Sequence, residues 1–215
     1  MAISAPGPSR ERQAPPEIAA LRRLKGEQPD LAAAVDMQID IVTLQRRAQA
    51  RLTTPWIDHD AAWLDARVRQ GEPLLRFDDI AFSWLELRVL FRQLTDVLRR
   101  FDLLDPSDHA ALQTLARASH PTTDEVRYWF DRRARRLEPP APRTAAHGDT
   151  FDQVLELSTR PFVERASGLV RARADVSPWD RPYCPFCGGD PEMAMVAADG
   201  QRNLHCGRCT GSWGF

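Results

Sequence analysis

The sequence predicts a mainly α-helical protein: an N-terminal helical bundle followed by a small β module of the zinc-ribbon or rubredoxin-like kind. Apolar residues recur three or four positions apart through most of the first 177 residues. No strand pattern appears before residue 180, and all four cysteines follow it in two Cys-x-x-Cys pairs. We therefore expect a disordered tail at 1–15, a helical domain at 16–177 and a tetracysteine metal-binding ribbon at 178–215.

Composition is ordinary for a globular protein, with 43% hydrophobic residues and 29 basic against 30 acidic side chains in a chain of 215. A net charge of -1 argues against non-specific nucleic-acid binding by the whole chain. No apolar run reaches the roughly 18 residues that a membrane span needs, and the N-terminus lacks the features of a signal peptide. We therefore expect a cytoplasmic protein with no membrane span.

Helical spacing begins at Pro16 and is strongest between Ile80 and Leu104. Apolar residues of that segment, Leu85 among them, cover more than one helix face, which is typical of the central helix of a bundle. We interpret three nearby aromatic residues as core or interdomain contacts, with a groove for a client peptide as the alternative: Phe82, Trp84 and Phe91.

Several motifs predict where helices begin and end. Asp105-Pro106 is typical of a helix start, and Thr122–Glu125 has the pattern of a capping box. Asp58-His59-Asp60 is interpreted as a helix cap rather than an acid/base cluster. The prolines of 138–148 predict a loop or hinge, and Pro161 predicts a break or kink in the helix around it.

The cysteines form the strongest motif of the chain. Cys184-Pro-Phe-Cys187 and Cys206-Gly-Arg-Cys209 are separated by 18 residues, within the usual spacing of zinc ribbons. Two residues between cysteines let a tight turn direct both sulfur atoms to one point. The Asp199-Gly200 hairpin signal between the pairs brings the two turns together. The pattern therefore predicts a tetrahedral site made of four thiolates.

All four ligand positions would be taken by Cys184, Cys187, Cys206 and Cys209, so the predicted site has no open coordination position. One zinc ion would be structural, whereas one iron ion would be rubredoxin-like, and the sequence leaves both open. Disulfides and redox-active Cys-x-x-Cys motifs are less favoured, because nothing indicates secretion or a βαβ context. His205 is interpreted as a strand residue rather than a ligand.

The ribbon resembles a known family. Cys184-Pro-Phe-Cys-Gly-Gly-Asp-Pro191, then Asn203-Leu-His-Cys-Gly-Arg-Cys209, and Trp213 are similar to the first metal-binding ribbon of the formate dehydrogenase accessory protein family (FdhE type). A helical domain comes first in that family too, and here Trp179 stands shortly before the ribbon. Members usually continue with a second cysteine-bearing ribbon, whereas this sequence ends at Phe215.

The resemblance implies an assembly or maturation factor, a chaperone that binds the catalytic subunit of formate dehydrogenase in the cytoplasm and is not itself an enzyme. We expect Trp213 and Phe215 either to be exposed contact residues or, equally, to cover the ribbon's own small core or the interface of a second ribbon. The alternatives are a nucleic-acid-associated zinc ribbon and a rubredoxin-like iron redox protein. The first is disfavoured because the only basic residues of 183–215 are Arg202 and Arg208. No P-loop, GxSxG or HExxH motif indicates an enzyme, and the oligomeric state is not predicted.

Overall fold

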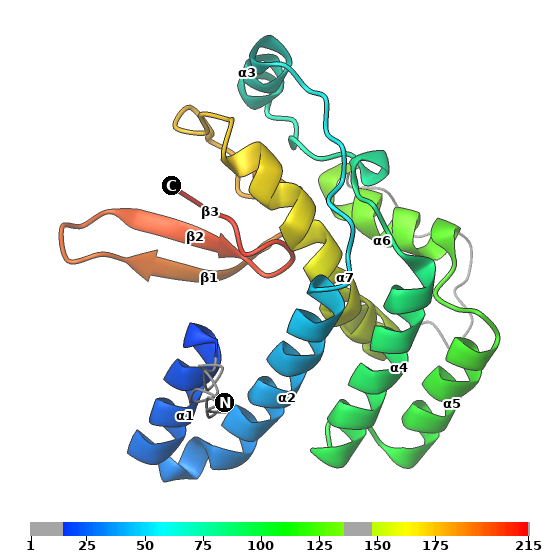
Figure 1. The fold of residues 1–215 in the computed structure, drawn as a ribbon. Coiled ribbons are helices and arrows are strands. Elements are labelled where there is room, and N and C mark those ends of the chain that lie inside the picture. The colour runs from blue at the N-terminus through cyan, green and yellow to red at the C-terminus, as the bar shows by residue number, and fades with distance from the viewer. Residues whose placement is uncertain (1–14, 136–147, 215) are drawn as a thin grey trace, which may run out of the picture.

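The structure, a computed structural model, describes residues 15–135 and 148–214. Helices dominate, and one small antiparallel sheet closes the chain (Figure 1), so the predicted fold class is confirmed. In chain order the elements are α1 (Pro16–Glu27), η1 (Pro29–Leu31), α2 (Ala32–Gln49), α3 (Ala61–Gln70), η2 (Phe77–Asp79), α4 (Trp84–Arg100), α5 (Pro106–Arg117), α6 (Thr123–Arg135), α7 (Asp149–Arg171), β1 (Pro191–Val196), β2 (Arg202–Cys206) and β3 (Ser212–Gly214). Predictions for the tail at 1–14, for Phe215 and for most of the proline-rich loop fall outside the described residues.

Helix α4 is central, as predicted, and packs against α2, α5 and α7. It begins at Trp84 rather than near Ile80, because Ser83 is its N-cap and a short 3₁₀ helix precedes it. Leu85 was wrongly placed in the core: its position on the first turn faces solvent, and it is 73% exposed. Phe91 is fully buried, which confirms the interpretation as a core residue. Phe82 and Trp84 stack on each other and pack against the core.

The predicted helix starts are confirmed by side-chain caps, which satisfy backbone N–H groups that have no partner inside the helix. Asp60 accepts a hydrogen bond from the backbone of Trp63 at 2.7 Å, and Asp105 caps α5 in the same way. Thr122 and Glu125 form the reciprocal capping box: the Thr122 N–H donates to the Glu125 carboxylate at 2.6 Å, and the Glu125 N–H donates to the Thr122 hydroxyl at 3.3 Å.

Of the break or kink predicted at Pro161, the break does not occur, since α7 continues through this residue. Proline has no N–H and therefore leaves the carbonyl of Leu157, one turn earlier, without its helical donor. The side chain of Gln45 on α2 supplies a replacement, because its Nε2 donates to the Leu157 oxygen at 2.8 Å. A residue 112 positions away in the chain thus satisfies the carbonyl that Pro161 leaves free.

The sheet has the order β1-β2-β3, with both neighbouring pairs antiparallel. The hairpin between β1 and β2 turns at Ala198-Asp199-Gly200, as predicted, with Gly200 in the left-handed region at φ 85°. The third strand, β3, had no sequence signal. Ribbon and helices share one cluster of buried apolar residues, which extends from Ile41 on α2 to Trp213 on β3. The hairpin itself projects from the body, away from α4 and α5 (Figure 1).

Candidate metal centre

Four buried cysteines gather at one point between the two turns that precede β1 and β3. Their sulfur atoms all lie within 4.8 Å of one another, and the pairs Cys184–Cys209 and Cys187–Cys206 are each 3.5 Å apart. Four sulfur atoms around a zinc ion with bonds of about 2.3 Å lie about 3.8 Å apart. The spacing therefore fits a single four-coordinate metal ion, and the structure brings together all four cysteines that the sequence singled out.

The two Cys-x-x-Cys turns, here called the first and second knuckles (184–189 and 206–211), have the same backbone hydrogen bonds. In the first, Cys184 N donates to Gly189 O at 2.8 Å and Gly188 N donates to Cys184 O at 2.9 Å. The second repeats both contacts at the equivalent positions, with distances of 2.9 and 3.1 Å. The knuckles are thus two copies of one turn, facing each other across the sulfur atoms.

The knuckle residues that adopt the left-handed conformation are Gly188 at φ 71° and Thr210 at φ 56°. The first is a glycine, which adopts this conformation without strain, but the second is β-branched. The Thr210 hydroxyl donates to the Glu164 carboxylate on α7 at 3.2 Å. That hydrogen bond holds the second knuckle, whose left-handed residue is the less favourable of the two, against α7.

Each knuckle also packs its third residue against a glycine of the other. A Cβ at Gly211 would lie 2.6 Å from Cδ2 of Phe186, and a Cβ at Gly189 would lie 2.8 Å from Cδ of Arg208. Both contacts are too close for any side chain at the two glycine positions. Glycine is therefore required at these two positions by the close approach of Phe186 and Arg208.

Arg208 joins the second knuckle to the helical domain. Its side chain is 2% exposed and lies over the ring of Trp129 on α6, with 4.0 Å between guanidinium carbon and ring centroid. The guanidinium donates to the carbonyl oxygens of Phe130 at 3.1 Å and Trp129 at 3.0 Å. A basic residue counted as part of the ribbon surface is therefore an internal contact between the two parts of the chain.

Other contacts hold both knuckles against the helices. The N–H groups of Leu74 and Leu75 donate to the carbonyls of Pro185 and Phe186, each at 2.8 Å. From α7, Ser167 donates to the carbonyl of Cys209 at 3.3 Å. The cysteine cluster therefore lies inside the fold, in contact with the helices on several sides.

Burial governs the ionisation of the thiols. It raises the pKa of Cys184 and Cys187 well above the ordinary value, because a thiolate is poorly solvated there. Hydrogen bonds from the other three thiols lower the pKa of Cys206. A bound cation would stabilise the thiolate form that burial disfavours at Cys184 and Cys187.

The remaining predictions for the ribbon have mixed outcomes. His205 pairs with Met193 across the sheet as a half-buried strand residue, as predicted. Of the two roles expected for Trp213, the core role is confirmed: it is 3% exposed and belongs to the common core, so it is not an exposed contact residue. It faces Leu204 on β2, a pairing made possible by the strand β3 that the sequence did not reveal.

His59 takes part in a contact that the sequence did not reveal. It is buried, stacks on Trp63 with 3.8 Å between ring centroids, and places Nε2 3.1 Å from the carboxylate of Asp79. Asp79 also accepts the backbone N–H of Arg76 at 2.7 Å. These contacts tie the segment before α3 to η2, 20 positions further on, a separation at which no sequence periodicity applies.

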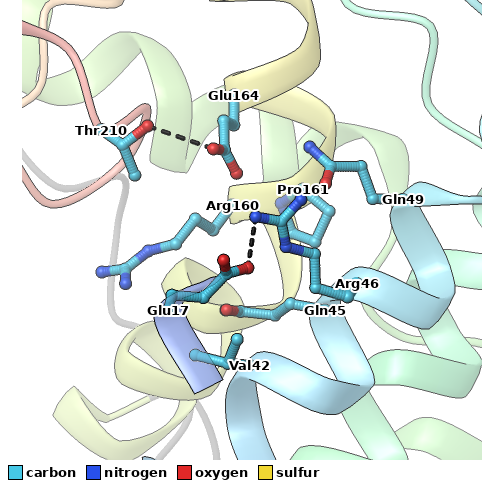
Figure 2. Close-up of a pocket in the computed structure, with 9 residues that line it drawn as sticks. All are labelled: Glu17, Val42, Gln45, Arg46, Gln49, Arg160, Pro161, Glu164 and Thr210. Carbon is cyan, nitrogen blue, oxygen red and sulfur yellow. Dashed lines mark hydrogen bonds and ion pairs between the residues drawn. The ribbon is translucent and has the colours of Figure 1, made fainter. Parts of the chain in front are cut away.

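A cleft of about 270 Å³ lies between α1 and α2 on one side and α7 and the second knuckle on the other (Figure 2). Glu17 pairs with Arg46 inside it, and Thr210 donates to Glu164 at its rim. The residues that line it are Glu17, Val42, Gln45, Arg46, Gln49, Arg160, Pro161, Glu164 and Thr210. The cleft brings the first helix close to the ribbon but contributes no side chain to the cysteine cluster.

Fold and site together define a class: a helical protein that carries a buried tetracysteine ribbon. No protein-family model matches the sequence. A curated relative, "Protein FdhE homolog" from Erwinia tasmaniensis, is 31% identical over 86 residues, which cover 36% of this chain and 28% of the relative. The crystal structure of the FdhE protein from Pseudomonas aeruginosa is similar with a TM-score of 0.52 and 17% identity, over 92% of this chain and 64% of that one.

The relative agrees with the resemblance inferred from the ribbon motif, which is thereby confirmed, and the solved structure, at 17% identity, shows that the fold is shared. The matched parts span 28% of the length of the relative and 64% of the solved chain. Within the part of the chain that the structure describes, no helix is long and apolar enough to cross a membrane.

Proposed function

We propose that this protein is a cytoplasmic accessory factor for formate dehydrogenase, which binds the catalytic subunit of that enzyme during assembly and does not itself catalyse a reaction. The cysteine cluster carries the proposal, because it is closed, buried and built into the core that ribbon and helices share. A site with four thiolate ligands and no open position stabilises a surface rather than activating a substrate. The names of the relative and of the solved structure, both FdhE, support formate dehydrogenase as the client enzyme.

We further propose that Cys184, Cys187, Cys206 and Cys209 hold one zinc or iron ion. Zinc would supply only cross-linking of the two knuckles, whereas iron would add a one-electron redox couple. The protein would prepare this site in two ways. The knuckle backbones orient the sulfur atoms, and the core around them excludes water. Elemental analysis of protein purified without oxygen should give one equivalent of metal, and two disulfides found by mass spectrometry with no metal would contradict the site.

The structure weakens the nucleic-acid alternative. Of the two arginines in 183–214, Arg208 is buried against α6, which leaves Arg202 as the exposed one. A single exposed arginine offers little attraction to a phosphate backbone. The rubredoxin-like alternative is decided by colour, because a ferric tetrathiolate absorbs visible light and zinc does not.

The client is tested with purified components. We expect the protein, loaded with metal under anaerobic conditions, to retain the purified catalytic subunit of formate dehydrogenase from its native host. No retention of this subunit would rule out the proposed assembly role. The variant Cys184→Ser/Cys187→Ser should bind more weakly, because the knuckles lose their cross-link. Equal binding by this variant would place recognition entirely on the helical domain.

A further inference from the structure

The two knuckles are held against the helical domain in different ways. The first knuckle is anchored through its backbone, because the carbonyls of Pro185 and Phe186 accept hydrogen bonds from the N–H groups of Leu74 and Leu75 at 2.8 Å. Both leucines are buried, and so is every residue of the first knuckle. Main-chain hydrogen bonds of this kind open only when two buried segments separate. The first knuckle is therefore a fixed part of the core.

The second knuckle is held against the helices by side-chain contacts. Thr210 contacts α7 twice: its hydroxyl donates to Glu164 at 3.2 Å, and its carbonyl accepts from Arg171 at 3.3 Å. Arg208 makes the shortest contacts, since its guanidinium donates to two carbonyls of α6 at 3.0 and 3.1 Å. Rotation of single side chains can break all of these contacts without a change in either helix. The second knuckle is therefore the half of the site that can move away from the helices.

Backbone conformation also favours movement of the second knuckle. Thr210 is exposed, and its φ of 56° is unfavourable for a β-branched residue. The first knuckle has Gly188 in the same conformation, which costs a glycine little. If the second knuckle moved, Thr210 could leave the left-handed region, whereas the first knuckle has no such strain to lose.

Movement of one knuckle would give access to the ligand atoms. While both knuckles contact the helices, no cysteine is more than 3% exposed. A closed site of four thiolates has no open coordination position, so an ion can be exchanged only when ligands move away from it. The second knuckle carries half of the ligand set, Cys206 and Cys209. Its departure from α6 would therefore open the site.

We propose that Arg208 controls the exchange of the metal ion: the second knuckle must leave α6 before an ion can enter or leave, while the first knuckle keeps Cys184 and Cys187 in place. Arg208 acts as a positioning residue, because it stands between two ligands and fixes their turn against α6 without being a ligand itself. The inference rests on the metal site of the proposed function.

Loss of zinc to a chelator measures this control. Protein loaded with zinc is mixed with an excess of a chromogenic chelator, and release is followed by absorbance. We expect Arg208→Met to release zinc about tenfold faster than wild type, because it loses the charged hydrogen bonds to α6. The matched control Arg202→Met makes the same change at an exposed arginine of β2 and should release zinc at the wild-type rate.

The outcomes separate the proposal from the site on which it rests. Release from Arg208→Met at the wild-type rate would overturn the role of Arg208 and leave the metal site intact. Wild-type protein that retains neither zinc nor iron would overturn both. Equal acceleration in Arg202→Met would also contradict the proposal, because that arginine does not contact α6 in the described structure.

Hydrogen exchange separates movement of the knuckle from a general loss of stability. In Arg208→Met we expect faster amide exchange in the second knuckle and unchanged exchange at Leu74 and Leu75. Equally faster exchange at both places would mean that global unfolding releases the ion, which contradicts the proposal. If Arg208→Met does not fold, Arg171→Met removes the donor to Thr210 and should release zinc severalfold faster. Release from this variant at the wild-type rate would then overturn the proposal.

Discussion

Arg208, placed between the second pair of cysteines, donates from Nη2 to the carbonyl oxygen of Trp129 at 3.0 Å and lies over the ring of the same residue. One side chain therefore links the cysteine cluster to helix α6. Its guanidinium is almost completely withdrawn from water, so its partners in the helical domain determine whether that burial is tolerated.

We predict that Arg208→Met lowers the free energy of unfolding by about 2 kcal/mol, because it keeps the apolar stem and loses the charged hydrogen bonds to α6. Arg208→Lys should fall between this variant and wild type, since an ammonium group does not bridge two carbonyls as a guanidinium does. Denaturant unfolding measures both effects. A methionine variant as stable as wild type would show that the buried charge contributes specificity and not stability.

Metal removal should destabilise the helices as well as the ribbon. The division of the chain at residue 177 remains a prediction, but the cysteines lie in the same buried cluster as the core of α4 and α7. Structural zinc contributes about 10 kcal/mol or more to the folding of small domains. We therefore expect a chelator, or Cys206→Ser, to lower the melting temperature recorded by helical circular dichroism. An unchanged helical transition would mean that ribbon and helices unfold independently.

Alanine at Gly211 should disturb the metal centre. Its Cβ would lie 2.6 Å from the ring of Phe186 and 3.2 Å from the sulfur of Cys209, both of which are held in place. Overpacking of this kind costs about 1–3 kcal/mol, and we expect a loss of this size together with weaker metal retention during dialysis.

The same substitution elsewhere provides the control. Gly26 lies in α1, and nothing stands within 4 Å of a Cβ built on it. Gly26→Ala should therefore stabilise the protein by about 0.5–1 kcal/mol through helix propensity. If both alanine variants changed stability in the same direction, the crossing of Phe186 over Gly211 would not be the cause.

A double-mutant cycle tests the contact between Gln45 and Leu157. Gln45→Leu leaves the carbonyl next to Pro161 without a donor, and we expect it to cost about 1–2 kcal/mol. In a Pro161→Ala background the restored N–H of residue 161 bonds that carbonyl, so the same change should cost much less. Equal costs in the two backgrounds would exclude the proposed compensation. Thermal unfolding of the four proteins completes the cycle.

The sequence predicted helix caps and turns correctly where a few neighbouring residues determine the local structure. The cap at Asp105, the capping box at Thr122 and the hairpin at Asp199-Gly200 each depend on hydrogen bonds or dihedral angles within four residues. The same holds for the two cysteine pairs, whose spacing alone indicates turns with converging sulfur atoms. All four cysteines meet as the spacing indicated.

Tertiary structure decided the features that depend on residues far apart in the chain. Helix α7 continues through Pro161 because Gln45 on α2 donates to the carbonyl of Leu157. Trp213 is buried because β3 pairs with β2, and a strand of only three residues is too short to show a pattern in the sequence. Arg208 was counted as a surface charge in the sequence, but in the structure it is an internal contact, because its guanidinium donates to the carbonyl of Trp129 on α6. In each case the energy of a buried polar group or ring depends on a partner from another element, and sequence periodicity carries no record of that partner.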